Sequence, residues 1–359
     1  MAGYKNQHFV PKCYLKRFSA GYEGRAINVY NLNRQMAIQN ASVKDQCSGN
    51  YFYGKDLRLE KLLSEEEALY DRIVMQVIGG NARFKQGYGE HLKRFAYLQF
   101  CRTESASWRF TLAMQDMLSV GGKLNDNVDW KEFKQQCVLD LVSAFVDTID
   151  PTSDLSICIV RNQTHAPFIA SDDPSVLTNR LYAQNRVAKG MTSGIASAGA
   201  ILLLPISPQC LVVIYGGDVY YLPNNLGFTT LRNSDDQLQI WNCSTNIYFS
   251  EWGDRDYLTK QIALCIASKP ANRHRVNTAV LDRVEEAGKK YRAVSKAELN
   301  GHSEILLHVE YLSPFPARWP SIIQWSVRRK AFYNGSGAGL LRRAQVLPDQ
   351  GFRNIFQRS

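Results

Sequence analysis

The residues best suited to chemistry lie close to the start of the chain, in Asn6-Gln7-His8-Phe9-Val10-Pro11. His8 is a side chain that acts as a general acid or base near neutral pH, or as a metal ligand. The amides of Asn6 and Gln7 are suited to orient a phosphate or a base edge. The structural alternative is a buried histidine that is hydrogen-bonded to a backbone carbonyl beside a chain-turning proline.

A second polar set, Ser171-Asp172-Asp173-Pro174, follows the apolar pair Phe168-Ile169, and His165 lies just upstream. We expect this set at the end of a strand. Paired carboxylates there bind a divalent cation, Mg²⁺ or Mn²⁺, or hold a histidine in one tautomer. The alternative is an Asp-Pro turn in which the aspartate caps its own backbone.

Arg102 and Gln99 form the third candidate, because residues three apart on a helix share a face. Arginine suits phosphate recognition, and the alternative is a salt bridge, for example to Glu104. The aromatic run Tyr51-Phe52-Tyr53 suits either base stacking or core packing.

These candidates need a framework of strands and helices to position them. Ile27–Tyr30 alternates apolar and polar residues and predicts a strand, with a hairpin return over Met36–Val43. Apolar residues at helical spacing predict helices after a capping box at Ser64 and Glu67, over 91–120 and over 130–149. Beyond Pro151 the pattern changes. There we expect strands at 155–160, 168–169, 200–204, 210–215 and 305–309, and helices at 254–267 and 277–287.

The net charge of +10 is concentrated at the two ends of the chain. Residues 1–44 and residues 310–359 each carry a net charge of +6, so the middle of the chain is close to neutral. Basic ends attract nucleic acid or an anionic nucleotide. The alternative is that these charges only keep the protein soluble. Neither the oligomeric state nor protein partners follow from these features.

Other motifs restrict the class of protein. The eight cysteines are scattered without Cys-x-x-Cys spacing, which disfavours a zinc ribbon and indicates free thiols in a reducing compartment. No signal-peptide core or membrane-spanning run is recognisable, so we expect a cytoplasmic protein without membrane contact. Walker A, Gly-x-Gly-x-x-Gly, His-Glu-x-x-His and Gly-x-Ser-x-Gly motifs are missing from the sequence, which disfavours the enzymes that use them.

An ordered set of segments resembles the DUF4238 family. The set comprises Gln7–Pro11, Tyr14–Phe18, Ile27–Tyr30, Arg102-Thr103 and Ser171–Pro174. The resemblance covers roughly residues 1–270. It implies a bacterial protein of uncharacterised function and supplies no catalytic residues.

The sequence therefore predicts an α+β protein with a small N-terminal β element, a central helical block and a C-terminal mixed, β-rich portion. The expected divisions are 1–150, 151–313 and a basic tail over 314–359 with a mobile end, or one continuous domain over 1–313. We expect a nuclease acting on RNA or DNA, of a bacterial defence or toxin type. His8 is then the acid or base, Asp172 and Asp173 bind metal or orient the histidine, and Arg102 holds phosphate, with Asn6, Gln7, Gln99, His165 and Ser171 contacting substrate. The alternative is a non-catalytic protein that binds a nucleotide or a partner.

Overall fold

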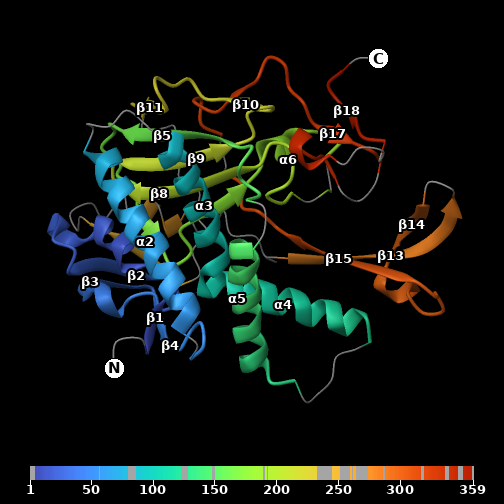
Figure 1. Ribbon diagram of the computed structural model, residues 1–359, viewed down its shortest axis with the longest axis horizontal. Coiled ribbons are helices and arrows are strands. Elements are labelled where there is room, and N and C mark those ends of the chain that lie inside the picture. The colour runs from blue at the N-terminus through green and yellow to red at the C-terminus, as the bar shows by residue number, and fades with distance from the viewer. Residues whose placement is uncertain are drawn as a thin grey trace.

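The computed structural model describes most of the chain. The described residues are 5–55, 57–79, 86–122, 128–147, 150–188, 191, 193–232, 245–250, 259–260, 262–263, 274–285, 288–316, 319–335, 339–346 and 351–357. Small strands come first, a block of long helices follows, and β-sheet dominates the rest (Figure 1). This arrangement confirms the expected mixture of α and β structure.

Two sheets form the centre of the molecule. The larger has the order β11-β5-β9-β8-β7, in which only β11 and β5 run parallel. The smaller is antiparallel with the order β3-β2-β12-β6. Their strands are β2 (Ala26–Asn31), β3 (Met36–Ser42), β5 (Ser156–Asn162), β6 (Ala170–Ser171), β7 (Val176–Thr178), β8 (Ile201–Ser207), β9 (Cys210–Tyr215), β11 (Phe228–Leu231) and β12 (Asn246–Phe249).

Both faces of the larger sheet are covered, which explains the nearly continuous apolar sequence of β8 and β9. On one face Leu202, Leu204 and Val212 join a core with side chains of the helices α2 (Leu57–Ile78) and α3 (Gln86–Arg102). Tyr70 of α2 stacks on Phe95 of α3 within that core, with ring centroids 3.7 Å apart.

The other face of this sheet packs against the short helix α6 (Arg180–Gln184) and the C-terminal segment. Ile323, Ala331 and Leu340 of that segment are buried among side chains from β8 and β9. The described part of residues 314–359 thus completes the second core. It includes β16 (Gln324–Trp325), which pairs with β10 (Tyr220–Tyr221), and the ribbon of β17 (Phe332–Tyr333) and β18 (Arg353–Asn354).

Three elements lie at the borders of this body. The ribbon of β1 (Asn6–His8) and β4 (Ser48–Asn50) follows the N-terminus, and the short helix α1 (Lys12–Leu15) comes directly after it. Helices α4 (Glu104–Val120) and α5 (Trp130–Asp147) pack together next to α3. Beyond α4 a sheet of order β14-β13-β15 projects from the body (Figure 1). Its strands are β13 (His274–Glu285), β14 (Gly288–Val294) and β15 (Ile305–Tyr311).

The structure differs from the sequence-based elements in three places. The helix expected over 91–120 is two helices, because Thr103 leaves helical geometry to cap α4 through a hydrogen bond from the Ala106 amide. Ser64 lies inside α2 instead of at its start, and its hydroxyl donates to the Glu60 carbonyl. The helix expected over 277–287 is wrong, since residues 277–285 belong to β13, which pairs with β14 on one side and β15 on the other.

The sequence also predicted a helix over 254–267 and a strand at 305–309. The helix expected over 254–267 lies largely outside the described residues. The strand expected at 305–309 is confirmed as β15. None of the helices in the described ranges has the length and apolar character needed to cross a bilayer.

Candidate functional site

Gln7 fixes the turn that follows β4. Its side chain is fully buried, and its Oε1 accepts a hydrogen bond of 2.6 Å from the Tyr53 amide. Its Nε2 donates to the Gly54 carbonyl at 3.0 Å. Because both amide atoms are used inside the protein, Gln7 holds residues 51–54 against β1. Asn6, its exposed neighbour, pairs with Asn50 across the ribbon.

His8 is half-buried, and its Nε2 lies 3.0 Å from the Lys44 carbonyl oxygen. A carbonyl only accepts hydrogen bonds, so this contact places the proton on Nε2 and leaves a lone pair on Nδ1. Burial lowers the pKa of His8 below its ordinary value, and the charges of Lys12 and Arg102 lower it further. The imidazole is therefore neutral at pH 7.

Arg102, the last residue of α3, binds the backbone of His8. Its side chain is 1% exposed, and Nη2 donates to the His8 carbonyl at 2.7 Å and to Glu67 at 2.8 Å. Nε donates to the Tyr53 hydroxyl at 2.9 Å, and that hydroxyl donates to the same carbonyl at 3.3 Å. Burial alone would lower the pKa of Arg102, but Tyr53 and Glu67 outweigh it and the net shift is upward.

The two neighbouring carboxylates point to different elements. Asp173 is fully buried, accepts a hydrogen bond of 2.8 Å from the Thr103 hydroxyl and forms an ion pair with Arg109 of α4. Asp172 accepts hydrogen bonds of 2.7 and 3.0 Å from the backbone amides of Thr245 and Asn246, where β12 begins. Each aspartate therefore anchors a separate part of the fold.

The junction between α3 and α4 brings the sequence candidates together. Arg102 binds β1 from this junction, and the next residue, Thr103, binds Asp173. The hydroxyl of buried Ser171 accepts from the Asp173 amide at 3.2 Å. These contacts join His8 to Arg102 through the His8 carbonyl, and they link neither carboxylate to the His8 imidazole.

Two other candidates have different surroundings. His165 is exposed in the loop after β5. Gln99 is completely buried, and no described residue forms a hydrogen bond with either atom of its amide. Across the described part of the chain, no group of three or more His, Cys, Asp or Glu side chains is arranged to hold a metal ion. The metal and catalytic roles of Asp172 and Asp173 stay predictions.

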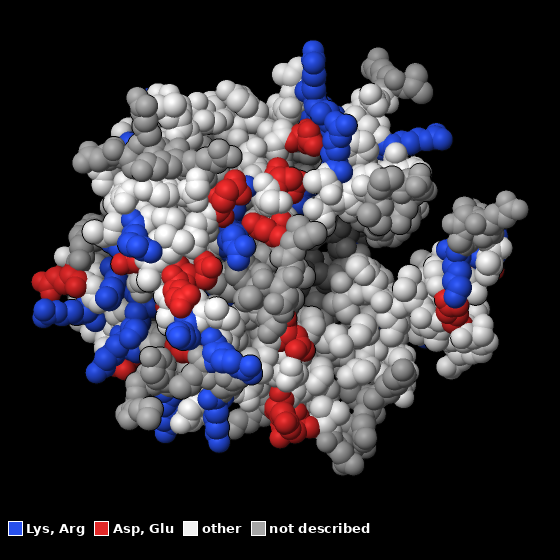
Figure 2. All heavy atoms as spheres, viewed as in Figure 1, with Lys and Arg blue, Asp and Glu red and all other residues white. Residues whose placement is uncertain are grey.

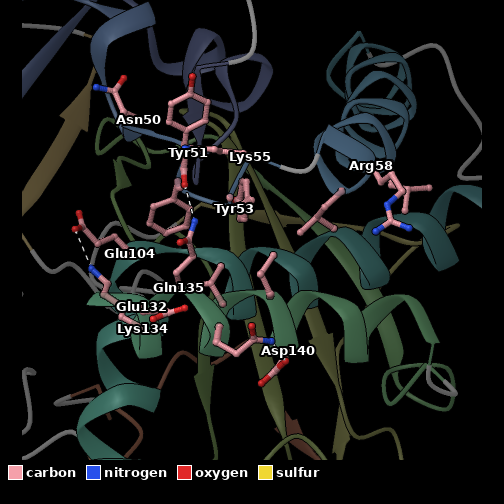
Figure 3. A pocket seen from close by; sticks show the side chains of 17 residues that line it. Asn50, Tyr51, Tyr53, Lys55, Arg58, Glu104, Glu132, Lys134, Gln135 and Asp140 are labelled. Atoms are coloured by element: carbon pink, nitrogen blue, oxygen red, sulfur yellow. Dashed lines mark hydrogen bonds and ion pairs between the residues drawn. The ribbon is translucent and has the colours of Figure 1, made fainter. Parts of the chain in front are cut away.

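An open pocket of about 1070 Å³ lies beside this network (Figure 3). Its walls are residues 50–55, the first turns of α2 and the α5 side chains between Glu132 and Asp140. Tyr53 belongs to both sites, because it lines the pocket while its hydroxyl binds Arg102. Burial raises the pKa of Tyr53 to about 12, which keeps this hydroxyl protonated as a donor.

Tyr51 is the exposed aromatic of the pocket, at 37% relative exposure. Its backbone has a φ of 52°, in the left-handed region that few non-glycine residues adopt. Gln135 of α5 donates to the Tyr51 carbonyl at 3.0 Å, as Figure 3 shows. The turn is therefore held from α5 as well as from Gln7. The sequence did not indicate that helix α5 forms a wall of this pocket, because its polar residues have the pattern of an ordinary solvent-exposed face.

The pocket has charges of both signs. Lys55, Arg58 and Lys134 line it together with the same number of acids, namely Glu104, Glu132 and Asp140. Lys134 is within 3.3 Å of Glu104 and lies over the Trp108 ring at 4.2 Å. Formal charges in the lining cancel, so aromatic contact and hydrogen bonding dominate what the pocket offers a ligand.

A comparison with protein families matches residues 6–252 to the family described as protein of unknown function, DUF4238. The chain belongs to the DUF4238 family. Neither the comparison with curated proteins nor that with solved structures finds a match. The matched region of this DUF4238 protein contains the α3–α4 junction and the pocket. It ends before the C-terminal segment that covers the larger sheet.

Proposed function

We propose that this protein binds nucleic acid and that the pocket receives an unpaired base. The observation that carries the proposal is the Tyr51 ring, exposed at the pocket on a turn fixed from two sides by Gln7 and Gln135. A rigid aromatic ring offers a stacking surface to any base, whatever its sequence. The fixed turn also reduces the conformational entropy that the ring loses on binding.

The lining provides partners for the rest of a nucleotide. Asn50 and Gln136 carry amides, which form hydrogen bonds with base edges. Lys55 and Arg58 bring positive charge to one side of the pocket. Since acids balance the cations within the pocket, long-range attraction of a phosphate backbone must come from outside it.

The surface next to the pocket supplies this attraction. Lys12, Lys16, Arg25, Arg34 and Lys44 are all exposed. Figure 2 shows Lys and Arg side chains gathered over the part of this face where Figure 1 places β1 to β4 and α2. Such a surface attracts the backbone without reading the sequence, while the pocket holds a base.

The test compares binding of labelled single-stranded RNA, single-stranded DNA and duplex DNA by fluorescence anisotropy. Stacking is worth about 1–3 kcal/mol per base, so Tyr51→Ala should weaken single-strand binding by roughly 5- to 150-fold. Tyr51→Phe should retain wild-type affinity because it keeps the ring. Tyr221→Ala is the matched control, since Tyr221 is 53% exposed and lies outside the pocket. Equal affinity of Tyr51→Ala and wild type would refute the proposal.

A second candidate function is phosphodiester hydrolysis by a nuclease. The protonation state and tautomer of the His8 imidazole favour it. A neutral imidazole with a fixed tautomer and a lone pair on Nδ1 is suited to accept a proton from an attacking hydroxyl or water. In this proposal Arg102 is a positioning residue, because its buried guanidinium holds the His8 carbonyl. A defence or toxin role is a further step that stays a prediction.

The nuclease candidate has its own test. Wild type and His8→Gln are incubated with RNA, single-stranded DNA and duplex DNA, each with and without Mg²⁺ or Mn²⁺. Cleavage by wild type that His8→Gln reduces at least 100-fold, with binding unchanged, supports general acid or base catalysis by His8. If both proteins bind nucleic acid and neither cleaves it, the nuclease candidate is refuted and only the binding function is supported.

A further inference from the structure

We propose that Arg329, with Arg328 beside it, contacts a phosphate of the nucleic-acid backbone. Both residues lie between β16 and β17, in the C-terminal segment beyond the family-matched region. The inference rests on the proposed function in one respect, namely that the ligand is nucleic acid. Its evidence is separate, because none of these residues lines the Tyr51 pocket.

The Arg329 guanidinium lies over two aromatic rings. Its Cζ lies 5.3 Å from the ring centroid of Trp325 and 4.8 Å from that of Phe356. Trp325 is in turn 4.8 Å from the Cζ of Arg180 and packs against Tyr220. Cations and rings therefore alternate along these contacts, and cation–π attraction to two rings holds the Arg329 guanidinium in place.

The backbone of this loop is also held on both sides. The Ser326 amide donates to the Val219 carbonyl and the Lys330 amide to the Asp218 carbonyl, each at 2.9 Å. Directly after the loop, the Ala331 amide donates to the Asn354 side chain at 3.1 Å. Arg329 is thus positioned before any ligand arrives, which reduces the entropy that binding costs.

Within the described part of the chain, the contacts of the Arg329 guanidinium are those with the two rings. The described residues give its guanidinium no hydrogen bond and no carboxylate partner, although the side chain is half-buried. Its neighbour Lys330 is different, because it lies 3.5 Å from Asp218. A planar fork of donors with uncompensated charge matches a phosphate, which accepts two parallel hydrogen bonds. Exposed Arg328 adds a second positive charge at the same place.

Val327, at the tip of this loop, is 99% exposed and raises the alternative of a membrane contact. A single valine buries too little apolar surface to hold a protein on a bilayer, since stable anchoring needs at least two contributions. The adjacent rings, moreover, serve to orient a guanidinium. We therefore favour a backbone phosphate over a lipid head group, and the experiment includes both ligands.

The experiment measures the affinity of the full chain for a labelled 20-nucleotide single strand between 50 and 250 mM NaCl. Each phosphate contact contributes about 0.7 to the slope of log K against log salt for single strands. Arg329→Gln should therefore reduce the magnitude of the slope by about 0.7, whereas Arg329→Lys should leave it unchanged. Arg292→Gln is the matched control, because Arg292 already lies within 4.0 Å of two acids, Asp282 and Glu298. Thermal melting confirms that each variant is folded.

The outcomes separate this inference from the proposed function. A wild-type slope in Arg329→Gln overturns the phosphate contact, even if Tyr51→Ala shows that the pocket binds a base. A reduced slope together with normal binding by Tyr51→Ala supports the phosphate contact and overturns the pocket. Binding of vesicles that contain phosphatidylserine, lost in Arg329→Gln while the DNA slope is unchanged, assigns the site to lipid and overturns the inference. A wild type that binds no nucleic acid overturns both proposals.

Discussion

The ion pair between Asp173 and Arg109 gives the most direct test of whether the neighbouring carboxylates Asp172 and Asp173 serve the fold or a reaction. Asp173 is completely buried and Arg109 nearly so. Asp173→Asn keeps the size of the side chain and an acceptor for the Thr103 hydroxyl, but it removes the negative charge beside Arg109. Removing one charge of a buried ion pair lowers the free energy of unfolding by about 3–5 kcal/mol.

This cost can be measured by thermal and urea unfolding. Unfolding entropy of about 2.1 cal/mol/K per residue implies that Tm falls by roughly 4–7 °C if the chain unfolds as one unit. In a double-mutant cycle, Asp173→Asn with Arg109→Met should recover part of the loss, because the double variant contains neither charge. The reasoning is refuted if Asp173→Asn melts within 1 °C of wild type. Loss of a bound metal or of an activity in such a stable variant would instead place Asp173 in a reaction.

Two further predictions concern pH and the C-terminal segment. His8 resists protonation in the folded protein, since its pKa is lowered from 6.5, so its contribution to stability is present above pH 6.5 and is lost as pH falls below that value. Urea unfolding from pH 8 to 5 should therefore show a weaker acid dependence in His8→Gln than in wild type, and parallel curves would contradict this. Arg342 is buried, with bonds of 2.8 and 2.9 Å to Asp154 and one of 2.7 Å to the Pro151 carbonyl, so Arg342→Met should cost about 3–5 kcal/mol. Limited proteolysis should then cut the C-terminal segment first, and a wild-type cleavage pattern in this variant would show that the segment is held by other contacts.

The elements of the fold that could be predicted are those with a local sequence signal. The apolar run from Ala200 to Tyr215 contains two buried strands, and its composition alone indicates them. Strand β13 was missed because apolar residues at Val276, Val280 and Val284 also fit a helical period. Its pairing with β14 and β15 decides the structure, and pairing partners are not visible in the segment itself.

The candidate residues show the same division between local and distant signals. The sequence indicated Gln7, Arg102 and Asp173 as candidate site residues, yet the partners of their side chains lie 35 to 94 residues away. The salt-bridge alternative for Arg102 is confirmed, and its partner is Glu67 on another element, helix α2. Within the aromatic run, only the fold separates buried Tyr53 from exposed Tyr51.

The adjacency of Arg102 and Thr103 restricts how chains of this kind can change in length. Arg102 is the last residue of α3 and Thr103 caps α4, so one side chain holds β1 while the next holds the segment after β6. Inserting or deleting one residue within the last turn of α3 would rotate both side chains away from their partners. Substitutions on the outer surface of α3 leave this register intact. Evolution of this protein should therefore tolerate changes in the composition of α3 far more readily than changes in the number of residues near its end.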